Sequence, residues 1–123
     1  MLAAAKLVGF IATKDPKGAR DFYQRILGLE LISEDQFATV FRSGDNVIRI
    51  ARVGSFTPFP FTVLGWEVDD VIRSAQRLRA NGVRFESFDG VSQDESGVWT
   101  APGGTKVAWF KDPDGNLLSI SGA

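Results

Sequence analysis

The feature that most constrains the fold is one pattern that recurs after 54 positions of the chain. Asp15 and Gly28 in the first half correspond to Asp69 and Gly82 in the second, and an amphipathic run separates the two residues in each half. An aspartate before such a run is typical of a helix N-cap, and a glycine after it is typical of a helix C-cap. A mostly apolar run precedes each aspartate, and short strand-like runs follow each glycine. The pattern predicts two copies of a β-α-β-β-β unit.

Turn residues set the expected limits of the elements. In the first copy we expect a strand over 6–13, a helix from 15 to 28, and strands over 30–34, 37–42 and 47–53. In the second we expect a strand over 61–68, a helix that begins after Asp69 or Asp70 and ends at 81–82, and strands over 83–85, 98–100, 105–111 and 116–121, with a polar loop over 89–97. Residues 54–60 contain two prolines and are expected to link the modules 1–53 and 61–123 within a single domain.

Each predicted helix has an apolar stripe that must be buried. Ala19, Phe22 and Tyr23 belong to the first stripe, and Val71 and Ala75 to the second. The simplest way to bury a stripe is to pack it on one face of its own sheet. We therefore expect an α+β fold in which the two modules pair edge to edge and form a curved mixed sheet around a cleft, with the helices outside.

The segment Asp112-Pro113-Asp114-Gly115-Asn116 lies between two apolar runs near the end of the chain. Proline fixes φ, aspartate bonds to its own backbone, and glycine allows a positive φ, so these residues favour a tight turn. The segment predicts a β-hairpin that joins the last two strands.

Composition removes several classes of function. The chain has 14 basic and 15 acidic residues, a net charge of −1, and no cluster of Lys and Arg, so nucleic-acid binding is not expected. No apolar run approaches the length of a membrane span, and a membrane partner is not expected either. Cysteine is absent, which excludes disulfides and thiolate metal sites and suits a cytoplasmic protein. Histidine, the commonest transition-metal ligand and general base near neutral pH, is also absent.

Three motifs stand in order along the duplicated pattern: Leu27-Gly28-Leu29-Glu30-Leu31, Gly65-Trp66-Glu67-Val68-Asp69-Asp70-Val71, and Asp112-Pro113-Asp114-Gly115-Asn116. Together, at this spacing, they resemble the glyoxalase/bleomycin-resistance/dioxygenase superfamily, also called vicinal oxygen chelate proteins. The resemblance covers essentially the whole chain.

The usual chemistry of that superfamily needs a divalent metal, which four ligands, typically His and Glu, hold inside the cleft. The resemblance places Val8, Val63, Arg49 and Ser119 at the ligand positions. Two aliphatic groups, a cation and a hydroxyl do not bind a divalent ion. We therefore expect no metal, no cofactor and no catalytic residue, and we do not expect the family's lyase, isomerase or dioxygenase activities.

The predicted ligand-binding residues are those that strand alternation and the resemblance place on the cleft side. They are Val8, Phe10, Arg49, Val63, Glu67, Trp99, Trp109 and Ser119. Trp109, Trp99 and Phe10 suit a stacking platform for a planar ligand, although aromatic residues on strands are also common in cores. An Arg49 inside an apolar cleft would bind an anionic ligand or pair with Glu67; alternatively it lies at the surface.

These observations favour a metal-free protein that binds a small hydrophobic or aromatic molecule, neutral or anionic, in its cleft, as in drug sequestration or sensing. Two alternatives stay open. One is an enzyme of the same superfamily that uses Glu67 or Arg49 without a metal, and the other is a structural or regulatory module that acts through protein contacts. Because members of the family commonly dimerise, a homodimer is expected.

Overall fold

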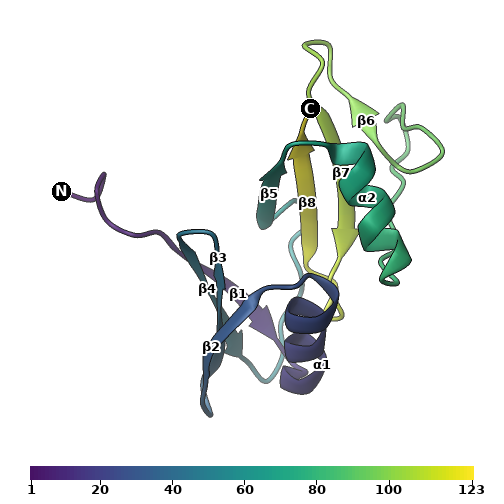
Figure 1. The fold of residues 1–123 in the computed structure, drawn as a ribbon. Coiled ribbons are helices and arrows are strands. Elements are labelled where there is room, and N and C mark those ends of the chain that lie inside the picture. The colour runs from purple at the N-terminus through teal and green to yellow at the C-terminus, as the bar shows by residue number, and fades with distance from the viewer. The chain divides into compact units, whose positions relative to one another are not determined.

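The computed structural model describes residues 1–123, which form two compact units, Met1–Thr57 and Pro58–Ala123. The boundary falls within the segment 54–60. Each unit contains one four-stranded mixed sheet and one helical segment, so the α+β class and the modular β-α-β-β-β pattern are confirmed (Figure 1).

The first unit consists of β1 (Val8–Thr13), α1 (Pro16–Asp21), η1 (Phe22–Ile26), β2 (Glu30–Glu34), β3 (Ala38–Ser43) and β4 (Asn46–Arg52). Its sheet has the order β1-β4-β3-β2. Strand β1 is parallel to β4, whereas the pairs β4–β3 and β3–β2 are antiparallel.

The helical segment of this unit begins as predicted and ends differently. The Asp15 carboxylate accepts a hydrogen bond from the N–H of Gly18 at 3.1 Å, and Pro16 occupies the first helical position. After α1 the backbone widens into the π-helical turn η1, in which the N–H of Leu27 donates to the carbonyl of Phe22 at 2.9 Å. The wider turn allows two consecutive aromatic residues, Phe22 and Tyr23, to be buried, with 7% and 0% of their surfaces exposed.

One face of the first sheet forms the core of this unit. The side chains of Ile11, Ile48, Ile50 and Phe41 are almost completely buried there. The Phe41 ring lies 6.1 Å from the ring of Tyr23, so the helical segment covers this face of the sheet.

The second unit consists of β5 (Leu64–Val68), α2 (Val71–Ala80), β6 (Trp99–Thr100), β7 (Lys106–Lys111) and β8 (Leu117–Gly122). The sheet order β5-β8-β7-β6 repeats the order of the first unit, and β5 is parallel to β8 as β1 is to β4. Asp70, and not Asp69, caps α2 by accepting from the N–H of Arg73 at 3.0 Å. Gly28 and Gly82 end the two helical segments with φ of 75° and 98°, as the repeat predicts.

Two strand predictions in this unit are wrong. The predicted strand 61–68 begins only at Leu64, so Val63 precedes it, although the N–H of Val63 still bonds to the carbonyl of Leu117 at 3.0 Å. Residues 83–85 form no strand, because the N–H of Val83 bonds back to the carbonyl of Leu78 and Phe85 forms only an isolated bridge with Phe110. The short β6 takes the place that β2 holds in the first unit.

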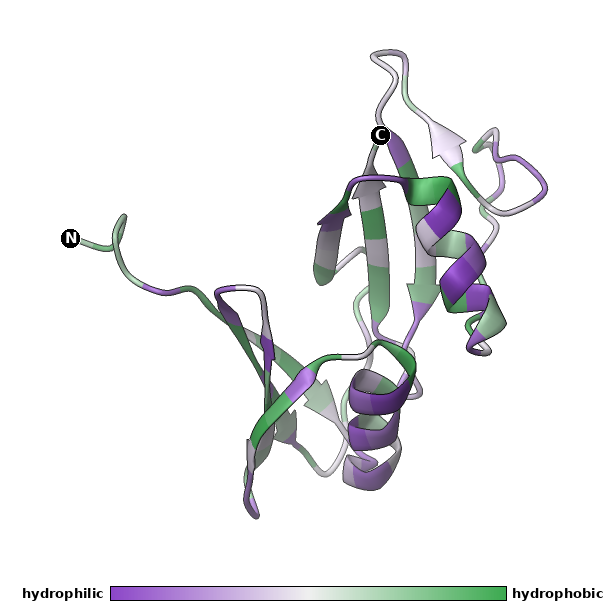
Figure 2. Ribbon diagram, viewed as in Figure 1, coloured by the Kyte–Doolittle hydropathy of each residue, from purple (hydrophilic) through white to green (hydrophobic).

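Helix α2 covers one face of the second sheet (Figure 1). Val71 and Ala75 on the helix and Ala108, Phe110 and Leu118 on the sheet are all fully buried. Figure 2 shows hydrophobic residues along β8, whereas much of the visible surface of both helices is hydrophilic. The predicted hairpin joins β7 and β8. No helix is long and apolar enough to cross a membrane.

Candidate functional site

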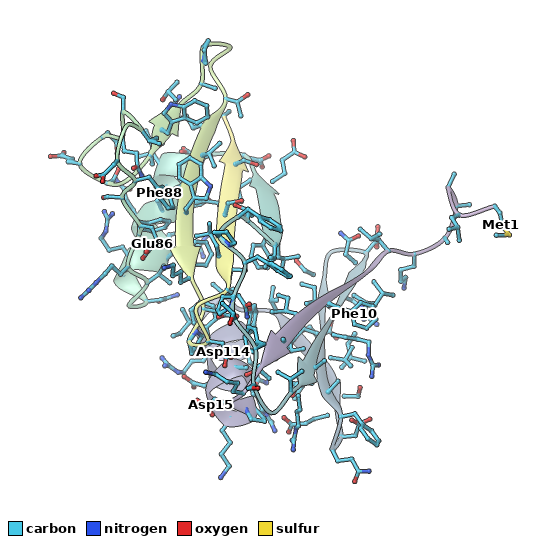
Figure 3. The ribbon with its side chains drawn as sticks, turned by 180° about the vertical axis from the view of Figure 1, so that it is seen from behind. Met1, Phe10, Asp15, Glu86, Phe88 and Asp114 are labelled. Atoms are coloured by element: carbon cyan, nitrogen blue, oxygen red, sulfur yellow. The ribbon has the colours of Figure 1, made fainter.

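The sheet of the first unit has a second face that its own helix does not cover. The strand register places Phe10 beside Arg49 and Arg49 beside Val40 on this face. Val8 and Phe10 are 40% and 67% exposed, whereas Ile11, which points to the helical side, is 5% exposed. Phe10 extends away from β1 in Figure 3. Val8, Phe10 and Arg49 therefore share one open and mostly apolar face.

Arg49 is the cation of this face. It lies between Val47 and Ala51 along β4 and forms no ion pair within its unit. Hydrogen bonds from the N–H groups of Phe37 and Ala38 lower the pKa of Asp35 below 3.8, desolvation opposes them, and the positive charge of Arg49 lowers it further. Because this carboxylate is held mainly by two backbone groups, the Arg49 guanidinium keeps its hydrogen-bonding capacity for another acceptor.

The sheet of the second unit also has a face opposite its helix. The register places Gly65, Ser119 and Trp109 in one row across three strands. A second row runs from Glu67 through Ser121 and Val107 to Trp99. A side chain at position 65 would meet the Ser119 hydroxyl, because an added Cβ would lie 2.7 Å from its Oγ. Glycine at position 65 therefore leaves room for the Ser119 hydroxyl on this face. Val63 lies just before this edge of the sheet.

Three aromatic rings meet at the other edge of this face. The Trp99 and Trp109 ring centroids are 6.3 Å apart with an interplanar angle of 34°. The Phe88 ring stands at 90° to the Trp109 ring, with centroids 5.4 Å apart. A ring stacked between the two tryptophans would need about 7 Å, twice the usual contact distance. A planar ligand must therefore lie on the open sides of the rings, not between them.

Sequence reasoning missed Phe88. This residue belongs to the segment 86–97 between α2 and β6, which has no regular strand to define which way a side chain points. The one feature of the sequence that could have indicated Phe88 as a site residue is that it is an aromatic residue beside a polar stretch. The structure shows that the segment is held by side-chain hydrogen bonds from Gln93 and Asp94.

Asp94 forms the turn that closes this segment. Its carboxylate accepts hydrogen bonds from the N–H of Val98 at 2.9 Å and from the N–H and hydroxyl of Ser96 at 2.8 Å. Burial raises the pKa of Asp94, but these hydrogen bonds and the charge of Arg79 outweigh it, so the pKa lies below 3.8. Asp94 therefore stabilises the turn of this loop as a carboxylate.

A cavity of about 510 Å³ lies at the Glu67 end of the same sheet. It is lined by Glu67, Gly103, Gly104, Thr105, Ser121, Gly122 and Ala123. The polar side chains of its lining are the hydroxyl groups of Thr105 and Ser121 and the carboxylate of Glu67. Polar groups of a ligand therefore suit this end of the face, and aromatic groups suit the end with Trp99 and Trp109.

The four residues that the sequence resemblance assigned to the ligand positions do not form a donor set for a divalent metal. Val8 and Val63 carry no donor atom, and Arg49 carries a positive charge. The Ser119 hydroxyl is the single oxygen that this set offers, and it is neutral. No group of three His, Cys, Asp or Glu side chains is arranged to hold an ion.

The predicted site residues thus fall into two sets. The first unit brings together Val8, Phe10 and Arg49, and the second brings together Glu67, Trp99, Trp109 and Ser119, with Val63 at the margin. In both sets the side chains point to the face that the helix leaves open, and Phe88 joins the second set.

Two mixed sheets with the same strand order, each covered by a helix on one face and open on the other, define a duplicated β-α-β-β-β protein. Residues 5–120 match the family model of the Glyoxalase/Bleomycin resistance protein/Dioxygenase superfamily, so the chain belongs to this superfamily and the resemblance seen in its motifs is confirmed.

Solved structures show the same fold. Lactoylglutathione lyase from Agrobacterium tumefaciens is 18% identical, with a TM-score of 0.76 over 98% of this chain and 94% of that one. A superfamily member from Sphaerobacter thermophilus is 20% identical, with a TM-score of 0.77 over all of both chains. An integron cassette protein from the metagenome of the Halifax Harbour sewage outfall is 15% identical, with a TM-score of 0.73 over 98% and 99% of the chains. No curated protein matches the sequence. At these identities the likeness extends to the fold alone.

Proposed function

We propose that this protein binds a small aromatic or hydrophobic molecule, neutral or anionic, on the open faces of its sheets, without a metal ion and without catalysis, as a sequestering or sensing protein does. The observation that carries this proposal is the unpaired Arg49 on an exposed apolar face, next to Phe10. Contiguous exposed apolar surface of this kind often marks a ligand-binding or interaction site. The aromatic rings and hydroxyl groups of the second unit supply the same kind of contacts.

Several features argue against acid–base or nucleophilic catalysis at these faces. Ser119 and Ser121 have no histidine that could activate them, because the chain contains none. Among the strand residues of the second sheet's open face Glu67 is the one carboxylate, and the nearby Glu86 carboxylate is paired with Lys111 at 3.5 Å, whereas a paired-carboxylate mechanism needs two free groups. Recognition by stacking and by one charge requires none of these groups. The homodimer and the cytoplasmic location stay predictions.

Two related fluorescent probes test the proposal. We expect the anionic probe 1-anilinonaphthalene-8-sulfonate and the neutral probe N-phenyl-1-naphthylamine to bind the folded protein saturably and to raise its melting temperature. Fluorescence titration gives the affinity, and the melting temperature shows that the folded state is the one bound. A probe that lowers the melting temperature binds the unfolded chain instead. That result, or the lack of saturable binding by both probes, would contradict the proposal and favour a module that acts through protein contacts.

The metal-free part of the proposal has its own test. Protein purified without a tag and dialysed against Zn²⁺, Ni²⁺ or Mn²⁺ is expected to retain no stoichiometric ion, because the ligand positions offer one neutral hydroxyl (Ser119) and one cation (Arg49). Elemental analysis measures the metal content. The melting temperature should also be the same with and without EDTA. One tightly bound equivalent of any of these ions would overturn the interpretation of Val8, Val63, Arg49 and Ser119.

A further inference from the structure

The segment 86–97 brings Phe88 to the aromatic edge of the second sheet. This segment leaves the helical side of the unit and returns to β6 without forming a strand of its own. The Phe88 side chain lies beside β7 in Figure 3 and stands perpendicular to the Trp109 ring. It is 36% exposed, so part of the ring contacts the protein and part faces solvent. A ring in this position extends the aromatic surface that Trp99 and Trp109 form.

We propose that Phe88 contacts the planar group of the ligand together with Trp109, and that Gln93 is the positioning residue that holds Phe88 in place. This inference rests on the proposed function, because it assumes that an aromatic ligand binds this face. It adds a residue outside the strands to the binding surface, and it assigns a positioning role to Gln93.

Gln93 uses both ends of its amide to hold the segment. Its Oε1 accepts a hydrogen bond from the N–H of Phe88 at 2.9 Å. Its Nε2 donates to the carbonyls of Glu86 at 2.9 Å and Gly97 at 2.8 Å. One side chain therefore joins the backbone of Phe88 to both ends of the segment. A side chain without these groups would leave the Phe88 backbone with fewer constraints, and the ring would lose its fixed angle to Trp109.

Apart from Gln93, Phe88 has one backbone hydrogen bond, which its carbonyl accepts from the N–H of Val91 at 3.2 Å within the same segment. The remaining anchors lie at the two ends of the segment. The Glu86 N–H bonds to the carbonyl of Trp109 at 2.8 Å, which fixes the start of the segment. The Asp94 turn fixes its end, and Arg79 donates to the carbonyl of Ser96 at 2.8 Å. These contacts remain when Gln93 is replaced. Loss of the Gln93 hydrogen bonds is therefore expected to release Phe88 without unfolding the unit.

The ring geometry explains why the position of Phe88 matters for binding. Because no ring fits between Trp99 and Trp109, a planar ligand lies on their open sides. The perpendicular Phe88 ring makes a corner with Trp109, and edge-to-face contacts are favourable for aromatic groups. A flat group placed in this corner contacts two rings at once. If Phe88 is displaced, the ligand contacts one ring instead of two, and we expect binding to weaken about 5-fold.

A double-mutant cycle with N-phenyl-1-naphthylamine tests both parts of the inference. We expect Phe88→Ala and Gln93→Met each to weaken probe binding about 5-fold, and the double variant to bind no more weakly than Phe88→Ala. Such non-additivity is what a residue acting through Phe88 produces, whereas an independent structural effect would multiply the two losses to about 25-fold. The near-UV circular dichroism of the free protein should change alike in both single variants, because both remove the contact between Phe88 and Trp109.

Gln76→Met is the matched control, since Gln76 is exposed on α2. It should leave affinity and circular dichroism unchanged. Unchanged affinity in Phe88→Ala or Gln93→Met, or multiplied losses in the double variant, would overturn the inference while the proposed function stands. If the wild-type protein binds neither fluorescent probe saturably, the proposed function fails and this inference fails with it. The two failures are thus distinguished by the wild-type titration.

Discussion

Replacing Asp112 with alanine is expected to lower the free energy of unfolding by about 3 kcal/mol. The Asp112 side chain, which is 6% exposed, organises the hairpin between β7 and β8 from inside. Its Oδ1 accepts from the N–H groups of Asp114 at 3.0 Å and Asn116 at 2.9 Å, and its Oδ2 accepts from the Asn116 side-chain amide at 2.9 Å. Alanine would leave three donors without this acceptor, at a cost of about 1 kcal/mol or more each.

Urea unfolding followed by circular dichroism measures this loss, which corresponds to a fall in melting temperature of about 10 °C for a chain of this size. The control is Asp45→Ala, in the exposed turn between β3 and β4, where the Asp45 side chain itself makes no hydrogen bond. That variant should lose less than about 0.5 kcal/mol. Equal losses at the two positions would show that Asp112 contributes only general turn propensity and not its buried hydrogen bonds.

Replacing Arg49 with methionine is expected to weaken binding of the anionic probe 1-anilinonaphthalene-8-sulfonate about 30-fold, within a range of about 10- to 100-fold. Methionine keeps much of the apolar stem and removes the charge. Binding of the neutral N-phenyl-1-naphthylamine should change less than about 2-fold, because it has no sulfonate for the guanidinium to bind. Raising the salt concentration should reduce the difference between the wild-type protein and the variant for the anionic probe.

Arg52→Met is the matched control for this experiment. Arg52 is on the same strand, and its alternation places it on the opposite face from Arg49. Both arginines lower the pKa of Asp35, so the control also removes a charge from the same neighbourhood. Equal losses in the two variants would mean that overall positive charge, and not Arg49 in particular, attracts the probe. Equal losses for the anionic and the neutral probe would mean that Arg49 supports the fold of the face and does not bind the anion.

The residues that sequence reasoning placed well have their causes close by in the chain. Asp15 and Asp70 cap their helices through N–H groups three positions further on. Gly28 and Gly82 end the helical segments because they adopt a positive φ. Asp112 lies inside the hairpin whose five-residue motif identified it. The spacing of these signals was sufficient to predict the duplicated pattern.

The errors concern residues whose structure depends on distant partners. Apolar character alone extended a strand back to Phe61, but pairing with β8 begins only at Leu64. The run 83–85 resembles a strand, yet Phe85 makes one bridge and then packs its ring 5.7 Å from that of Phe110. The π-helical turn η1 begins at the two consecutive buried residues Phe22 and Tyr23. Helical periodicity assumes a regular turn and cannot show this widening.

The candidate site divides in the same way. Alternation along strands correctly grouped Val8 with Phe10, and Gly65 with Glu67, because side chains alternate between faces at every residue. Phe88 lies on no strand, so no periodicity defines its direction. Its place beside Trp109 results from three hydrogen bonds of Gln93 to backbone groups up to seven positions away.

The amino-acid sequence by itself determined the two β-α-β-β-β units, their helix ends and the hairpin at Asp112, because each depends on residue types within a short stretch. Only the tertiary structure decided that Arg49 stands unpaired beside Phe10 on an open face, and that Phe88 completes an aromatic corner with Trp109. The physical reason is that these contacts join residues from separate strands and loops. The register of the sheets and the hydrogen bonds of Gln93 bring them together, and neither is encoded in the spacing of any one segment.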